Sequence, residues 1–444
     1  MTFATTKTRR LYPLMVSVKG ICMKMRLVKG SSLQHVHKGF GMIGVIVVST
    51  LLFVLVAAPV RAQVAVRGET VHTMAGSSIK DGVVVVRDGK IEQMGPAAQI
   101  KIPKGYRVLR AKVVTPGLVD AHTVVGLSGY LNQVQDQDQV DRSAAMQPEL
   151  RALDAYNPQE RLVEWVRGFG TTTMHTGHGP GVLVSGQTMI VKTRGKTVEE
   201  AVMVPVAMIA VTLGDDAREA IKGPGTRAKM IAMLRAELIK AQEYSRKLNT
   251  AAEDKKPARD LRLEAFSRVL KRELPLMVTV QRANDIMSAL RVAQEFNIRL
   301  ILDGAAEAYL VTEQIKESGV PVIVHPTMAR AGGETENLSM ETASKLKKAG
   351  IPIALQTGFE SYVPKTRVVL YEAAIAAANG LSFDEALASV TIDAARLLGV
   401  DNRVGSLAPG KDGDLALFDG DPFEYTSHCV GVVIQGEVVS EEPR

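Results

Sequence analysis

The sequence contains few cysteines and few aromatic residues, and each scarcity excludes a class of protein. Of the two cysteines in 444 residues, Cys22 lies in the N-terminal leader, which leaves Cys429 without a partner. A disulfide framework is therefore excluded. Aromatic residues make up 5% of the chain, and no segment combines them with a basic face of the kind that binds nucleic acid.

Acidic residues are missing from the first 62 positions, which carry nine lysines and arginines. The formal net charge of the whole chain is +7, so removing these nine positive charges leaves −2 for residues 63–444. The basic character belongs to the leader, and we expect no nucleic-acid partner for the rest of the chain.

Residues 1–62 are typical of a signal peptide. A basic stretch precedes the apolar run FGMIGVIVVSTLLFVLVAA, and Val60 and Ala62 supply small residues before a cleavage site. We expect the leader to be removed and the protein to be periplasmic or secreted. The apolar run is also long enough to span a bilayer. The alternative is therefore an anchor retained at residues 40–60, the one case in which we expect contact with a membrane.

Both ends of the remaining chain show the pattern of short strands and turns. Asp81-Gly82 and Asp88-Gly89 are hairpin-type turn signals between β-branched runs, and the segments GDLALFDGDPF and VGVVIQGEVV have the same character. We expect residues 63–115 and 400–444 to join into one small β-sandwich domain.

Between these ends, short apolar runs alternate with amphipathic helical patterns over residues 116–399. The runs predict eight buried strands, at 117–122, 171–175, 188–192, 202–211, 276–280, 299–303, 320–325 and 351–356. Eight such strands with crossover helices favour an α/β fold of the TIM-like (β/α)8 barrel type. A doubly wound open sheet is the structural alternative. The long, charged and helical stretch at about 226–273 predicts a helical insertion between the fourth and fifth strands.

Three sequence segments resemble the amidohydrolase superfamily, in particular its imidazolonepropionase-like exported branch. They are IKDGVVVVRDGKIEQMG, VVTPGLVDAH and ALASVTIDAARLLGVDNRVGSLAPGKDGDLALFDGDPF, and they occur in the order that this family has. The resemblance implies a (β/α)8 barrel with a β-sandwich made from both termini. It also implies hydrolysis of C–N bonds of amides or cyclic amides by water bound to one or two divalent metals.

When the metal-ligand positions that the resemblance implies are compared one by one with this sequence, few ligands remain. His122 matches the first ligand histidine, and Val124 replaces the second. Lys192 is the position that resembles a bridging carboxylated lysine, although a lysine at a strand end is usually a solvated charge. Gly358 stands near the place of the expected metal-binding aspartate. The implied cofactor is thus one divalent metal, with zinc the first choice, or none.

Polar residues at the predicted strand ends still favour a functional site, because barrels of this type gather function there. We predict that Asp303 and His325, which end adjacent strands, act as catalytic acid–base partners, and that His175, His178 and Gln281 contact substrate. The structural alternatives are that His325 caps its strand and that the glycine-rich segment around His178 is a simple turn.

Two hypotheses follow for the function. The first is an exported hydrolase that acts on C–N bonds other than peptide bonds in a small molecule, with an atypical or depleted metal site. The alternative is a non-catalytic protein of the same fold that binds a small ligand or a partner. The sequence is also compatible with a homo-oligomer.

Overall fold

The computed structural model describes residues 63–444 except 132, 221–222, 328, 330 and 360–367. The predicted signal peptide at 1–62 lies outside the described residues. Within the described part of the chain, no helix is long and apolar enough to cross a membrane.

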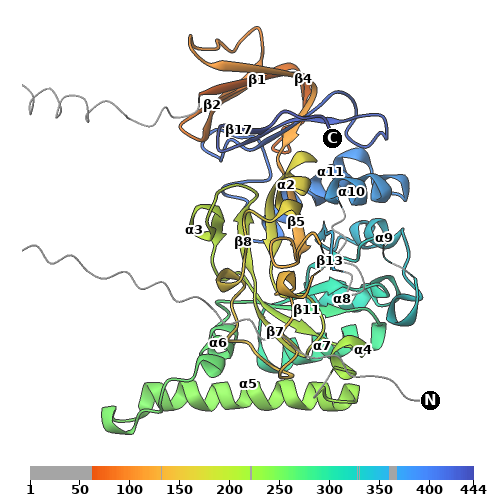
Figure 1. Ribbon diagram of the computed structural model, residues 1–444. Coiled ribbons are helices and arrows are strands. Elements are labelled where there is room, and N and C mark those ends of the chain that lie inside the picture. Colours follow the sequence, from red (N-terminus) through yellow and green to blue (C-terminus); the bar gives the residue numbers. More distant parts are fainter. Residues whose placement is uncertain (1–62, 132, 221–222, 328, 330, 360–367) are drawn as a thin grey trace, which may run out of the picture. The chain divides into compact units, whose positions relative to one another are not determined.

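Strands from both ends of the chain form a single seven-stranded sheet, drawn in orange and dark blue in Figure 1. The order across the sheet is β17(Glu437–Ser440), β16(Cys429–Ile434), β15(Leu415–Phe418), β4(Arg107–Pro116), β1(Val64–Val71), β2(Ile79–Arg87) and β3(Lys90–Pro96). We predicted that the two end segments join into one small β-sandwich domain, and the structure pairs their strands in one continuous seven-stranded order.

The C-terminal strands join the N-terminal ones through the antiparallel pairing of β15 with β4, where Leu415 lies opposite Pro116 and Phe418 opposite Val113. Valines and leucines from both segments share one buried cluster, to which Val66, Val114 and Leu417 belong. Burial of such side chains removes apolar surface from water, so each segment stabilises the other.

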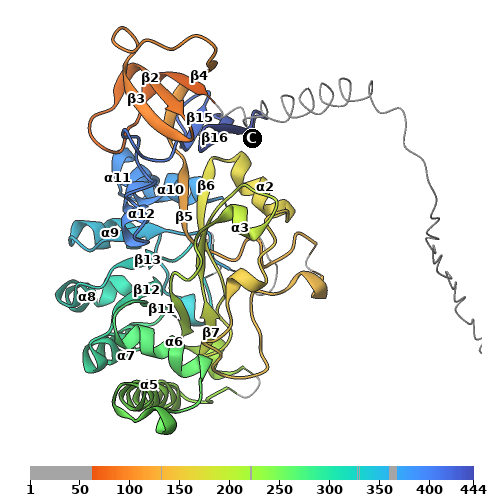
Figure 2. The ribbon, with the colours of Figure 1, turned by 90° about the vertical axis from the view of Figure 1, so that its left-hand side faces the viewer.

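Five strands of the central region run parallel, as expected for a TIM-barrel-like α/β fold. These are β10(Ile209–Thr212), β11(Leu276–Val280), β12(Leu300–Gly304), β13(Val322–Val324) and β14(Ile353–Leu355). A second parallel pair is formed by β5(Leu118–Thr123) and β6(Thr171–Thr176). Nearly every residue of these strands is buried, because helices and loops cover their outer face (Figure 2).

The predicted barrel of eight parallel strands needs a correction. The strands belong to two separate sheets, and β7(Val184–Gln187), β8(Met189–Lys192) and β9(Val202–Val204) are antiparallel to their neighbours. Backbone hydrogen bonds connect the edges of the two sheets, among them those from the Gly358 amide to the His122 carbonyl (3.1 Å) and from the Thr188 amide to the Met208 carbonyl (2.9 Å). The one run predicted at 202–211 is divided into β9 and β10.

The helices follow the predicted strand–helix alternation. They are α2(Arg161–Gly168), α3(Val198–Ala201), α4(Asp215–Arg218), α7(Ala283–Phe296), α8(Thr312–Ser318), α9(Thr342–Lys348), α10(Val369–Ala378), α11(Phe383–Ser389) and α12(Ile392–Leu397). The segment predicted as an insertion contains the long α5(Arg227–Thr250) and α6(Leu261–Leu270), drawn in green in Figure 1. Asp260 caps α6 by accepting hydrogen bonds from the amides of Arg262 and Leu263, which satisfies two donors that a helix start leaves free.

Candidate functional site

A cavity of about 470 Å³ lies at the carboxyl ends of the parallel strands. Its lining includes His122 from β5, Thr279 from β11, Asp303 from β12, and Gln281, His325 and Gln356, which directly follow β11, β13 and β14. In open or closed parallel α/β folds, ligands bind at this edge of the strands.

His122 and Asp303 form a buried ion pair at this cavity. The ring nitrogen Nδ1 of His122 lies 2.9 Å from Oδ1 of Asp303, and each side chain is only 2% exposed. Asp303 also accepts hydrogen bonds from the Thr279 hydroxyl (2.6 Å) and the Gln356 amide (2.9 Å). Three donors therefore hold the carboxylate in place, and the carboxylate in turn fixes the orientation of the imidazole.

The second ring nitrogen of His122, Nε2, is buried and has no hydrogen-bond partner among the described residues. Because an ionised carboxylate only accepts hydrogen bonds, Nδ1 must carry a proton. Nε2 is then the atom at which His122 can gain or lose a proton. A buried polar atom without a partner requires an explanation, and His122 differs from His178, whose ring nitrogens are also buried without partners among the described residues, in that it lines the cavity.

The electrostatic surroundings favour the charged form of this pair. Burial by itself lowers the pKa of His122, but the charge and hydrogen bond of Asp303 outweigh it, so the pKa of His122 is raised. Burial also opposes ionisation of Asp303, and attraction to His122 together with the three hydrogen bonds outweighs that effect, so the pKa of Asp303 is lowered.

His175 lies behind His122, with ring centroids 5.8 Å apart, and does not line the cavity. Its Nδ1 donates to the Ala121 carbonyl (2.7 Å), and its Nε2 accepts from the Thr188 hydroxyl (2.6 Å). Burial, followed by repulsion from His122, lowers the pKa of His175 to about 3. His175 is therefore a neutral structural histidine, which corrects the prediction that it contacts substrate.

His178 is also buried outside the cavity lining. Its ring packs directly on Gly186, where an added Cβ would lie 2.5 Å from Nε2. Burial lowers the pKa of His178 to about 4. The predicted role in substrate contact is thus not met by the geometry, because the glycine-rich segment turns this ring toward β7.

Lys192, the predicted metal bridge, is committed to a different interaction. Its ammonium pairs with Asp412 (3.1 Å) and with Asp414, and the lysine side chain is 3% exposed. Both aspartates belong to the GKDGD motif of the C-terminal segment. Lys192 therefore joins β8 to that motif, and the interpretation as a metal ligand is corrected.

The predicted acid–base pair of Asp303 and His325 is not formed. His325 instead donates from Nδ1 to the Pro326 carbonyl (3.1 Å) and contacts the Thr342 hydroxyl through Nε2 (3.3 Å). The reasoning from adjacent strands missed His122 as the partner of Asp303, because β5 and β12 are distant in sequence. Thr279 was also missed, although its register opposite Asp303 in the β11–β12 pairing is a signal that could have found it.

Gln281, predicted to contact substrate, lines the cavity, and its side-chain carbonyl accepts a hydrogen bond from the Ala306 amide (3.2 Å). Gly304, at φ +79°, makes room for it, because an added Cβ there would lie 2.6 Å from the Gln281 amide nitrogen. Four charged lining residues were not predicted from the sequence, namely Arg142, Asp215, Asp216 and Glu334. Arg142 lies in a segment without regular structure, and the other three lie in the one-turn helix α4 and in the 3-10 helix Gly333–Thr335, which are too short for a periodic pattern to mark the direction of a side chain.

Comparison with known proteins agrees with this architecture. The sequence model of the amidohydrolase family matches residues 113–439. An imidazolonepropionase of Rhizorhabdus wittichii is 26% identical over 396 residues, covering 80% of this chain and 92% of the relative. An imidazolonepropionase of Xanthomonas oryzae pv. oryzae is 23% identical over 367 residues, covering 77% and 88%.

Among solved structures, an amidohydrolase from Thermotoga maritima superposes with a TM-score of 0.81 at 30% identity, covering 85% of this chain and 100% of that one. An adenosine deaminase from Xanthomonas campestris with bound zinc shares the fold at a TM-score of 0.50 and 15% identity, covering 85% of this chain and 93% of that one. The chain belongs to the amidohydrolase family.

The residues present do not fit the metal site that this family implies. A catalytic zinc site needs about three protein ligands from His, Asp, Glu or Cys. The described residues contain no group of three or more such side chains arranged to hold a metal ion. Strand β5 ends at Thr123, Val124 is buried and apolar, and the oxygens of Asp303 are already taken by three hydrogen-bond donors. In the described part of the chain, His122 Nε2 is thus not joined by enough further ligand side chains to hold a metal ion.

Proposed function

We propose that this protein is a hydrolase that cleaves a C–N bond, other than a peptide bond, in a small molecule. Membership of the amidohydrolase family and the imidazolonepropionases among its relatives support this reaction class. The observation that carries the proposal is the His122–Asp303 pair: His122 lines a cavity large enough for a small ligand, and its buried Nε2 atom has no hydrogen-bond partner among the described residues.

In this proposal His122 moves the protons of the reaction. Neutral imidazole takes a proton at Nε2 from water as the water oxygen bonds to the carbonyl carbon. The imidazolium then gives this proton to the leaving nitrogen as the C–N bond breaks, so that an acid and an amine result. Asp303 is a positioning residue, since its carboxylate holds Nδ1–H and stabilises the imidazolium that forms.

The experiment measures ammonia or amine release from a panel of simple amides, lactams and imidazolones. We expect His122→Gln to lower kcat by roughly 10²- to 10⁴-fold, the usual contribution of a general acid–base residue. The matched controls are His428→Gln and Asp419→Asn, which alter a similar pair (3.1 Å) at the surface and should leave the rate unchanged. The proposal fails if His122→Gln retains wild-type turnover.

A second candidate function is ligand binding without catalysis. It is favoured by Val124 and Gly358, which stand at or near positions where the family is expected to have metal ligands. Binding of panel members in calorimetry, together with no turnover by wild type with or without added zinc, would support this function over hydrolysis.

We also propose that the protein is exported. The basic leader, the apolar run and the small residues Val60 and Ala62 support cleavage before Gln63. Mass spectrometry of the protein isolated from its native host should give an N-terminus at Gln63. Recovery of an intact leader in the membrane fraction would contradict cleavage and support a retained anchor.

A further inference from the structure

The cavity lining includes one positive and one negative side chain that have no partner among the described residues. Arg142 and Asp216 both line the cavity and are both exposed. In the described part of the chain, neither forms a hydrogen bond or an ion pair through its side chain. An arginine and an aspartate that face the same hollow without pairing are available to a ligand.

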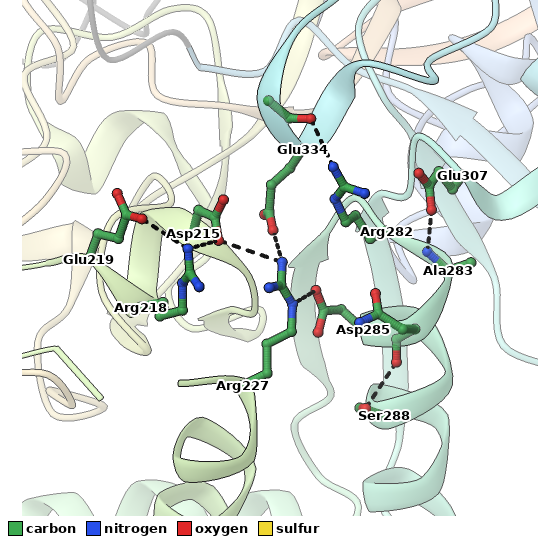
Figure 3. Close-up of polar contacts among 12 residues, drawn as sticks. Asp215, Arg218, Glu219, Arg227, Arg282, Ala283, Asp285, Ser288, Glu307 and Glu334 are labelled. Atoms are coloured by element: carbon green, nitrogen blue, oxygen red, sulfur yellow. Dashed lines mark hydrogen bonds and ion pairs between the residues drawn. The ribbon is translucent and has the colours of Figure 1, made fainter. Parts of the chain in front are cut away.

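The other carboxylates of this wall are already compensated. Arg227, the first residue of α5, lies at the centre of a cluster in which it pairs with Glu334, with Asp285 (2.8 Å) and with Asp215 (3.5 Å), as Figure 3 shows. Arg218 binds Asp215 from the opposite side at 2.8 Å. A cationic ligand would therefore gain little from these carboxylates.

This cluster also fixes the geometry of the wall. Gly214 has φ +115°, and an added Cβ would lie 2.0 Å from Oε2 of Glu334. A glycine is required for Glu334 to approach so closely, and the approach holds the loop of Gly333–Thr335 against α4. Asp216 is the next residue after Asp215 in α4, so its backbone is held by the same support.

Arg142 approaches from a different segment. Its guanidinium packs over Gly181, where an added Cβ would lie 3.2 Å from one terminal nitrogen. Loss of solvation raises the pKa of Asp216, and Arg142 is the one positive charge that opposes this effect. The charges of the two side chains therefore interact electrostatically, although the side chains are too far apart to form an ion pair.

We propose that the cavity binds a zwitterionic ligand of the amino-acid type, with its carboxylate on Arg142 and its ammonium group on Asp216. The planar fork of arginine suits a carboxylate, and a ligand with both charges satisfies both free side chains at once. As a statement about substrate, this rests on the proposed hydrolase function, because the remainder of the ligand would bring its C–N bond to His122.

The test uses four compounds with the same amide group: L-glutamine, Nα-acetyl-L-glutamine, L-glutaminamide and glutaramide. They carry both charges, the carboxylate alone, the ammonium alone and neither. Calorimetric titration of the full chain should show glutamine binding about tenfold more tightly than either singly charged compound, the effect of one charge-assisted hydrogen bond. Glutaramide should bind most weakly.

Two substitutions test separately the contact to the ligand carboxylate and the contact to the ligand ammonium group. Arg142→Gln should weaken glutamine and acetylglutamine about tenfold and leave glutaminamide unchanged. Asp216→Asn should weaken glutamine and glutaminamide and leave acetylglutamine unchanged. Arg235→Gln and Glu295→Gln, which alter the two partners of an exposed ion pair outside the cavity lining, are the matched controls.

The outcomes separate this inference from the proposed function. Equal affinity for all four compounds, no measurable binding of any of them, or equal losses in both variants would overturn zwitterion recognition. Selective binding of glutamine without hydrolysis would support the recognition and contradict the hydrolase function. Hydrolysis of uncharged amides, with no preference for charged compounds, would support the hydrolase function and contradict zwitterion recognition.

Discussion

Asp120 and Thr357 lie 237 residues apart in sequence and share two hydrogen bonds. The Thr357 amide donates to Oδ1 of Asp120 (3.1 Å), and the Thr357 hydroxyl lies 2.6 Å from Oδ2. Because Asp120 is in β5 and Thr357 follows β14, this contact connects the two central sheets beside the cavity.

This contact predicts a dependence of stability on pH. Burial raises the pKa of Asp120 to about 7, although hydrogen bonds from Thr357 oppose the shift. Between an unfolded pKa of about 4 and a folded pKa of about 7, the folded carboxyl keeps a proton that the unfolded chain has lost. The protonated carboxyl therefore makes its full contribution to the free energy of unfolding below about pH 4. This contribution is lost as the pH rises to about 7, and the loss is at most roughly 4 kcal/mol.

Chemical denaturation of wild type and Asp120→Asn at several pH values measures this effect. The difference in unfolding free energy between the two proteins should change in favour of the variant as the pH rises from 4 to 7, and stay constant above. A difference that is independent of pH would show that Asp120 is ionised in the folded state.

The rate of hydrolysis should also depend on pH through His122. Since neutral imidazole starts the proposed reaction, and Asp303 raises the pKa of His122, kcat/KM should increase with pH up to this raised pKa and then level off. Asp303→Asn removes the attraction, so the increase should move to lower pH and the plateau should fall. A profile that does not move in this variant would exclude His122 as the titrating group.

Replacing Lys192 by methionine should destabilise the protein strongly. The substitution leaves Asp414 buried without a cation among the described residues, whereas Asp412 keeps Lys90 and Arg403, and breaking a buried pair typically costs about 3–5 kcal/mol. Arg194→Met breaks a solvent-exposed pair with Glu437 and should cost no more than about 1 kcal/mol. Equal losses of unfolding free energy in urea would contradict a special role for the Lys192 network.

Gly358→Asp, which places a carboxylate near the position expected for the family's metal ligand, should be poorly tolerated. Gly358 has φ +68°, and an added Cβ would lie 2.6 Å from Cγ of Pro326. Gly350→Asp is the matched control, because Gly350 has φ +83° with no heavy atom within 4 Å of the added Cβ. Both variants carry the strain of positive φ, of order 1–3 kcal/mol. Only Gly358→Asp adds the clash, so its melting temperature should be the lower of the two.

Much of the secondary structure was determined by local sequence. The β-branched run at 276–280 predicted β11 with its observed bounds, and the charged segment at 226–273 predicted the helices α5 and α6. The capping box of Ser382 and Glu385 marks the start of α11 in the same way. Such features depend on the spacing of apolar side chains and on caps within a few residues, which the sequence contains directly.

The partners of the polar residues were decided by the tertiary structure. Asp303 pairs with His122 across the two sheets and not with His325 on the next strand, and Lys192 points to Asp414, 222 residues away, and not into the cavity. A buried charge must find a partner of opposite sign or lose its charge. Which partner it finds depends on strand direction and on the closure of the two sheets, and neither is encoded in any short segment of the chain.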